Sequence, residues 1–197
     1  MAKKTVETAL RSCAVHIESV SPYSASRAHE EEKLANETHD DYDRRTWRHK
    51  LTTDANGMVV IPRGGFKQAI DGAAKMVGGK IPGKGNATYS KLFTTGVLVE
   101  GDVELGVHAN DVESIRIHAN ADGIRGSGKR VFRIFPILPT WSGVVNVLIT
   151  DPELPEEVFE RVMTAAGRCQ GVGRWRPEKG GSNGRFTVSK FEWSNVA

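Results

Sequence analysis

Cysteine is scarce in this chain of 197 residues. Cys13 and Cys169 lie far apart in the sequence, so they provide neither a disulfide framework nor the paired spacing of a zinc site. No apolar run approaches the roughly 18–20 residues that a membrane-spanning helix needs. The first seven residues include two lysines with no apolar stretch behind them, which is unlike a secretory signal. We therefore expect a cytoplasmic protein with no metal, no cofactor and no membrane partner.

Motifs of the common enzyme classes are also missing. The sequence has no GxxxxGK[ST] phosphate loop and no HExxH zinc motif. Three features could still carry chemistry: His16 as a base, Asp122 as a carboxylate that cleaves a nucleic acid, and an acidic stretch with His29 and His39 that could hold a divalent cation. An incidental histidine and a solvated acidic loop are simpler explanations. We expect no catalytic activity, and an enzyme remains the alternative.

Charge is segregated along the chain, although the net charge is only +3. Residues 27–43 contain two basic and seven acidic side chains, whereas residues 63–91 and 168–190 each contain six basic and one acidic side chain. A nearly balanced chain with strongly basic segments is typical of a surface that binds a polyanion. Solvated loops would give the same pattern, so charge alone leaves both interpretations open.

Hydrophobic periodicity predicts both helices and strands. Apolar residues recur at helical spacing over residues 66–77, where Gly78-Gly79 provides a stop, and a second helix follows the acidic entry at 151–157. A short helical segment fits residues 87–95. Strands are predicted at residues 10–20, 97–105, 112–118, 131–138, 144–150 and 185–193.

Two hairpins are predicted among these strands. Asn56-Gly57 joins residues 46–53 to residues 58–61, because both turn residues tolerate a positive φ. Ser142-Gly143 joins the two most β-prone runs, 131–138 and 144–150, into a hairpin at the centre of the sheet. The whole order is an α+β, ferredoxin-like (RRM-like) β-α-β-β-α-β core in a single domain, residues 1–197, with both helices on one face. Insertions fall at about 21–45 and 106–130.

Two glycine-rich basic loops are the strongest binding signals. Residues 171–184 join a helix to the last strand, and there glycines let backbone amides approach a phosphate, arginines supply planar forks and Trp175 offers a face on which a base could stack. Residues 80–85 repeat the glycine and lysine pattern after the first helix. A loop with its tryptophan packed in the core is the competing interpretation. The candidate nucleic-acid-binding residues are Arg63, Lys67, Lys84, Arg125, Lys129, Arg130, Arg174, Trp175, Arg176, Lys179 and Arg185.

Two motifs resemble a known family. Residues 61–69, IPRGGFKQA, resemble the signature that opens the first helix in the RAMP superfamily of CRISPR proteins. The glycine-rich stretch that ends in Gly184-Arg185-Phe186 is similar to the superfamily's C-terminal glycine loop and last strand. The resemblance implies a ferredoxin-like fold, backbone subunits that polymerise along a guide RNA, and a protruding thumb hairpin, for which residues 119–129 are the candidate. The chain also resembles small phage and prophage proteins with a TWRHKL…IP…FK core.

These observations predict a non-catalytic protein that binds single-stranded nucleic acid, with RNA favoured over DNA. We expect it to form a homo-oligomer or filament along the strand, and CRISPR-type proteins are further candidate partners. In such a filament the acidic residues 30–43 of one subunit would meet a basic loop of the next. Two alternatives remain: a metal-independent or metal-assisted endoribonuclease of the same superfamily, and a phage inhibitor that mimics a backbone subunit.

Overall fold

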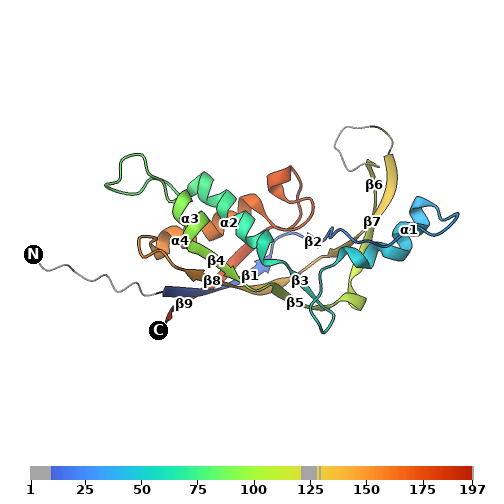
Figure 1. Cartoon of the computed structure of the whole chain (residues 1–197), viewed down its shortest axis with the longest axis horizontal. Helices are drawn as coiled ribbons and strands as arrows, with labels where there is room; N and C mark the ends of the chain where they lie inside the picture. The colour runs from blue at the N-terminus through green and yellow to red at the C-terminus, as the bar shows by residue number, and fades with distance from the viewer. Residues whose placement is uncertain (1–9, 121–127, 129, 197) are drawn as a thin grey trace, which may run out of the picture.

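A four-stranded antiparallel sheet forms the centre of the molecule (Figure 1). The computed structural model describes residues 10–120, 128 and 130–196. The strand order is β4-β8-β1-β9. The strands span Val97–Glu100 (β4), Ser142–Ile149 (β8), Leu10–Ser19 (β1) and Phe186–Val196 (β9).

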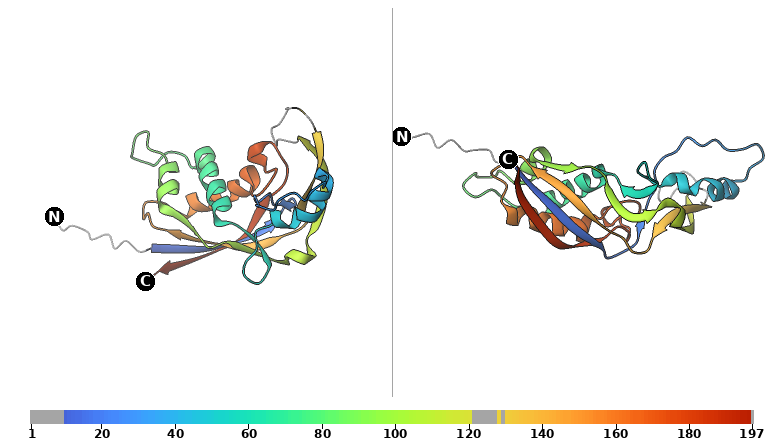
Figure 2. Two further views of the ribbon diagram at one scale, coloured as in Figure 1. Left: turned by 45° about the vertical axis from the view of Figure 1, so that its right-hand side comes forward. Right: turned by 90° about the horizontal axis from the view of Figure 1, so that it is seen from below.

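Helices cover one face of this sheet. They are α2 (Arg63–Val77), α3 (Ser90–Gly96) and α4 (Glu156–Ala165), and Figure 2 shows them on the same side of the strands. In chain order the core reads β1-α2-β4-β8-α4-β9. With the strand order above, this confirms the predicted ferredoxin-like α+β fold. The predicted helices, the short helical segment and the first and last strands are all present.

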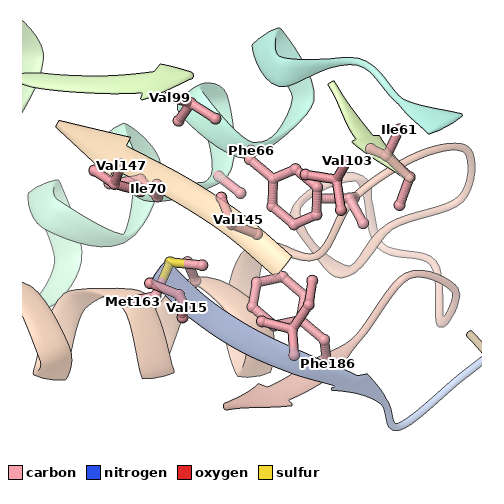
Figure 3. Packing of buried hydrophobic residues seen from close by; sticks show 14 of the residues in the cluster. Val15, Ile61, Phe66, Ile70, Val99, Val103, Val145, Val147, Met163 and Phe186 are labelled. Carbon is pink, nitrogen blue, oxygen red and sulfur yellow. The ribbon is translucent and has the colours of Figure 1, made fainter. Parts of the chain in front are cut away.

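Alternation along the strands places the hydrophobic core between the sheet and the helices. On β1, Cys13, Val15 and Ile17 are buried, while the residues between them are partly exposed. Val15 pairs with Val145 of β8, and both lie below Phe66 of α2 in Figure 3. Burying an aliphatic or aromatic side chain of this size contributes about 1.5–3 kcal/mol, so this layer holds the helices on the sheet.

A second sheet extends from the first and corrects the predicted central hairpin. Strand β7 (Arg130–Leu138) pairs with β6 (Glu113–Asn120) and with β2 (Tyr23–Ser24), and it has no ladder with β8. The prediction of a 131–138/144–150 hairpin was wrong because Ser142-Gly143 is not its turn: both residues lie inside β8. A Cβ on Gly143 would lie 2.9 Å from the carbonyl oxygen of Glu104. The glycine therefore permits the close approach of another strand.

The strand predicted at 97–105 is divided in two. Its second half belongs to β5 (Val103–His108), which pairs with β3 (Met58–Ile61) instead of β8.

The predicted hairpin around Asn56-Gly57 forms only in part. The turn forms, with Gly57 at φ 80° and the Asp54 amide bonded to the carbonyl of Met58. On its N-terminal side there is no strand, and a single β-bridge joins Thr53 to Val59 across the turn. Residues 47–50 form a 3₁₀ helix, η1 (Trp47–Lys50), and not a strand.

The acidic insertion folds into α1 (His39–Thr46) and lies along the free edge of β7. Asp43 accepts a hydrogen bond from the amide of Ile134, and Lys50 donates one to the carbonyl of the same residue. These bonds satisfy edge groups that β2 is too short to reach. None of the described helices is long and apolar enough to cross a membrane.

Acidic side chains of the insertion find cationic partners within the same chain. Arg45 binds Glu31 and Glu37, and Asp40 binds both Arg44 and Arg116. Ion pairs that form within the folded chain therefore neutralise part of the acidic segment. It does not require the predicted contact between residues 30–43 and a neighbouring subunit, because carboxylates on residues 30–43 already have partners.

Candidate nucleic-acid interface

The glycine-rich loop between α4 and β9 is tied down by its own backbone. The amide of Val172 bonds to the carbonyl of Gly184, and the amide of Gly184 bonds to the carbonyl of Pro22. Gly184 has φ 71°, and a Cβ there would lie 1.8 Å from the Val172 carbonyl oxygen. The loop therefore depends on glycine for its shape, and that shape fixes the residues at its tip.

Trp175 is held outward at this tip. Its φ of 61° lies in the left-handed region, which bulky residues rarely adopt. The carbonyl of Trp175 accepts a hydrogen bond from the amide of Asn183, and its side chain is 52% exposed. A strained backbone around an exposed aromatic residue is typical of functional sites, where the surrounding structure maintains the strain.

Arg174 lies between two aromatic rings. Its Cζ atom is 3.6 Å from the centroid of Phe135 on β7 and 5.0 Å from the centroid of Trp175. Its amide donates to the carbonyl of Ser24 at 2.7 Å, which anchors the backbone. Among the described residues the guanidinium has no hydrogen-bond acceptor and no ion pair. The stack therefore orients a set of planar donors and leaves them available for a ligand.

Positive charge accumulates around Phe135. Lys50 Nζ lies 4.4 Å from the same ring centroid, and Asp43 binds both Lys50 at 3.1 Å and Arg133 at 2.9 Å. Lys50 and Arg174 thus both lie against the Phe135 ring, while the carboxylate of Asp43 is shared by Lys50 and Arg133. Burial, together with the charge of Arg133, lowers the pKa of Arg174 below its ordinary value. An anion at this position would relieve both effects. We call Arg174, Trp175 and Phe135 the aromatic–guanidinium stack.

The other predicted residues of the loop are engaged in holding it. Arg176 binds Glu178 at 2.7 Å and reaches Gln68 of α2 at 3.2 Å, while Lys179 binds the other oxygen of Glu178. Arg185 donates from its guanidinium to the carbonyl of Arg168. These cations lie on or next to the loop that carries Arg174 and Trp175, and each of them already donates to an acceptor of the same chain.

Lys67 and Lys84 lie in different surroundings. Lys67 binds Asp71 at 2.6 Å and the carbonyl of Phe93 at 2.8 Å, so it joins α2 to α3. Lys84 pairs with Glu153 at 2.6 Å, in the loop at the other end of the helical layer from residues 171–185 (Figures 1 and 2). The structure does not bring Lys84 together with Arg174 and Arg185, so these three residues do not form one groove as predicted.

The remaining predicted cations fall elsewhere. Arg63 begins α2, where its amide bonds to Asp102 at 2.9 Å. Arg130 begins β7 and donates to the carbonyl of His118. Arg125 and Lys129 lie outside the described residues, as does Asp122 and most of the thumb candidate.

Sequence reasoning missed the aromatic residues of the β6/β7 hairpin. Phe132 is 46% exposed, with the Cζ of Arg116 3.8 Å from its ring centroid and the ring of His118 at 5.0 Å. Phe135 was also missed, because the run 131–138 reads as a buried strand. The only available signal was the charged Arg133 between Phe132 and Phe135 in that run, which is unusual for a strand buried on both faces.

The candidate catalytic and metal-binding residues that the structure describes, His16, His29 and His39, do not form a shared centre. His16 lies on the open face of the sheet, where its Nε2 is 3.1 Å from the carboxylate of Glu192. Within the described part of the chain no three His, Cys, Asp or Glu side chains are arranged to hold a metal ion. The acidic stretch with His29 and His39 is instead organised by arginines.

Comparison with known proteins supports the fold. No protein-family model and no curated protein matches the sequence. A chain in the cryo-EM structure of the type III-B Cmr-beta bound to cognate target RNA superposes with a TM-score of 0.55 at 14% identity, over 96% of this chain and 62% of that chain. The two chains therefore share a fold. The crystal structure of Cmr6 from Pyrococcus furiosus gives a TM-score of 0.48 at 15% identity, over 94% of this chain and all of that one. The chain spans less than two thirds of the first of these structures.

Proposed function

We propose that the chain is a non-catalytic protein that binds single-stranded RNA through the aromatic–guanidinium stack. The observation that carries the proposal is the guanidinium of Arg174, which has no ion-pair partner among the described residues and lies against Phe135 and the exposed Trp175. A phosphate matches the planar donors of arginine, and a base can stack on the outer face of the tryptophan. A further support is that the fold neighbour with the TM-score of 0.55 comes from an assembly bound to cognate target RNA.

Substitutions within the stack test this proposal. Stacking a base on an aromatic side chain contributes about 1–3 kcal/mol, so Trp175→Ala should weaken binding of a labelled uridine oligonucleotide by about 5- to 150-fold. Trp175→Phe keeps a ring and should retain most of the affinity. Arg174→Ala removes one phosphate contact, and the slope of log affinity against log salt should become flatter by about 0.7.

The matched control is Lys91→Ala, which removes one exposed positive charge on α3, away from the stack. It should leave the affinity unchanged. Fluorescence anisotropy measures all four variants, and circular dichroism confirms that each is folded. Equal affinity of wild type, Arg174→Ala and Trp175→Ala would refute the role of the stack. If the wild type binds a deoxyuridine oligonucleotide of the same length more tightly than the uridine oligonucleotide, the preference for RNA is refuted.

We also propose that several copies bind side by side along one strand. The sheet face opposite the helices carries exposed Leu98 and Val144 and has no covering helix among the described residues, so a neighbouring subunit could pack there. Light scattering with RNAs of increasing length should show complexes that grow by whole multiples of the 21.5 kDa chain. A complex with one chain at every RNA length would contradict this part of the proposal.

A metal-independent endoribonuclease is the second candidate function. His16 lies beside the carboxylate of Glu192 on the open sheet face, and a carboxylate that orients an imidazole is the usual arrangement of a general base. End-labelled RNA incubated with the protein, with and without EDTA, tests this function. Cleavage that His16→Ala abolishes would support an enzyme, whereas intact RNA in both reactions would refute it.

A further inference from the structure

A cavity of about 690 Å³ lies beside the acidic insertion and is separate from the stack. The cavity is open to solvent, and its lining residues come from segment 27–30, from η1 with Leu51 and Thr53, and from Ala109 and Asn110. This volume is within the range of pockets that hold a small organic ligand, about 300–1,000 Å³. Buried Leu51 provides an apolar surface, while the other walls are mostly polar.

Two arginines line this cavity without a carboxylate partner. Arg48 has its Cζ 4.2 Å above the ring of Trp47, and Arg27 is anchored by its amide to the carbonyl of Lys50. Within the described residues neither guanidinium forms an ion pair or a side-chain hydrogen bond. Their neighbours on the insertion, Arg44 and Arg45, are both paired with acidic residues. Among the described residues, the guanidinium groups of Arg27 and Arg48 are thus available to an anion that enters the cavity.

Two histidines also line the cavity, and Nδ1 of His49 lies 3.7 Å from the carboxylate of Glu31. The ring centroids of His29 and His49 lie 5.6 Å apart, and His29 also packs on Tyr42 at 6.0 Å. Nδ1 of His29 is buried with no hydrogen-bond partner among the described residues. Stacking therefore positions the His29 ring without fixing its protonation state.

Glu30 is the one carboxylate among the described residues of the lining. Beside two arginines it would oppose binding of a bare phosphate. A carboxylate accepts hydrogen bonds and donates none, so it matches the hydroxyl groups of a sugar. Asn110, on the opposite wall, can both donate to and accept from a base.

We propose that this cavity binds a phosphomonoester of a nucleoside, with the phosphate between Arg27 and Arg48, the ribose hydroxyls at Glu30 and the base on Leu51 near Asn110. The site goes beyond the proposed function, because none of its lining residues belongs to the aromatic–guanidinium stack. The same chemistry has two sources, a free mononucleotide and the phosphorylated end of an RNA.

Calorimetric titration with adenosine monophosphate tests the proposal. Wild type should show saturable binding, which Arg27→Ala and Arg48→Ala each weaken at least about tenfold. Arg168→Ala removes an exposed arginine outside the cavity and should bind like wild type. Trp175→Ala should also keep this affinity while it loses affinity for RNA, so that failure here and failure of the proposed function are distinguishable.

A second measurement needs no substitution. The ring proton resonances of His29 and His49 should shift on addition of adenosine monophosphate, and adenosine without phosphate should leave them unchanged. RNA with a 5′-phosphate, compared with the same RNA with a 5′-hydroxyl, separates the two sources. In the Trp175→Ala variant, tighter binding of the phosphorylated RNA than of the 5′-hydroxyl RNA assigns the site to an RNA end, and equal binding of the two RNAs assigns it to a free nucleotide. The proposal is overturned if neither compound shifts these resonances, or if Arg27→Ala and Arg48→Ala bind like wild type.

Discussion

The buried carboxylate of Asp43 supports one quantitative prediction about stability. Asp43 accepts hydrogen bonds from Lys50 Nζ at 3.1 Å, from Arg133 Nε at 2.9 Å and from the Ile134 amide at 2.9 Å. The side chains of Asp43 and Lys50 are 1% and 6% exposed. Asp43→Ala would leave the Lys50 ammonium buried without a counter-ion, and removing one partner of a buried ion pair costs about 3–5 kcal/mol.

This cost is large for a domain of this size. Melting temperatures of domains of 150–250 residues fall by about 2–4 °C per kcal/mol, so Asp43→Ala should lower the midpoint by about 6–20 °C. Urea unfolding should give a matching decrease in the free energy of unfolding with an unchanged m-value. The control is Asp40→Ala, which breaks exposed ion pairs with Arg44 and Arg116 and should leave the midpoint nearly unchanged.

A double substitution separates the buried charge from the lost contacts. Asp43→Leu with Lys50→Met removes both members of the pair, and apolar replacement of a buried ion pair is often close to neutral. The double variant should therefore be more stable than Asp43→Ala. The reasoning is refuted if Asp43→Ala changes stability no more than Asp40→Ala does, or if the double variant is the least stable of the three.

Three further predictions concern other parts of the chain. Gly184→Ala should prevent folding or cost more than about 3 kcal/mol in thermal unfolding, because its Cβ would overlap a carbonyl oxygen, whereas Gly83→Ala, with φ 75° and open space, should cost about 1–2 kcal/mol. Burial lowers the pKa of His29, so the unfolded chain binds the proton first and stability should fall as pH drops below 6.5; urea unfolding of His29→Gln should lack this component. Burial raises the pKa of Cys13 to about 12, so a thiol reagent at pH 8 should modify Cys169 alone, and modification of both thiols in the folded protein would contradict this.

Hydrophobic periodicity was sufficient to predict the core of the fold. The helical spacing from Phe66 to Val77 and the alternation of Cys13, Val15 and Ile17 are local patterns, and each depends on burial of one face. Six such elements in order allow few arrangements of an antiparallel sheet. The ferredoxin-like topology could therefore be predicted before any pairing was known.

Strand partners could not be predicted in the same way. The runs that became β7 and β8 are both rich in β-branched or aromatic residues, and nothing local shows that the chain changes sheets between them. Gly143 reads as a turn residue, but it is required because β5 passes close to it. A glycine needed for a close approach and one needed for a turn look the same in a sequence.

The candidate site was predictable only in part. Arg174 and Trp175 could be predicted because glycine, arginine and tryptophan occur within a few residues of one another in the sequence. Phe135 and Asp43 come from distant segments, and only the fold brings them to the loop. The basic residues that seemed equivalent in the sequence differ in the structure, because ion pairs such as Lys84 with Glu153 depend on long-range contacts.

The most direct test of the central claim is the affinity of single-stranded RNA for Arg174→Ala compared with Lys91→Ala over a range of salt concentrations. The account predicts that Arg174→Ala binds more weakly and with a slope flatter by about 0.7, while Lys91→Ala binds with the slope of wild type. If the two variants lose affinity equally, or neither does, RNA is not bound by the guanidinium between Phe135 and Trp175.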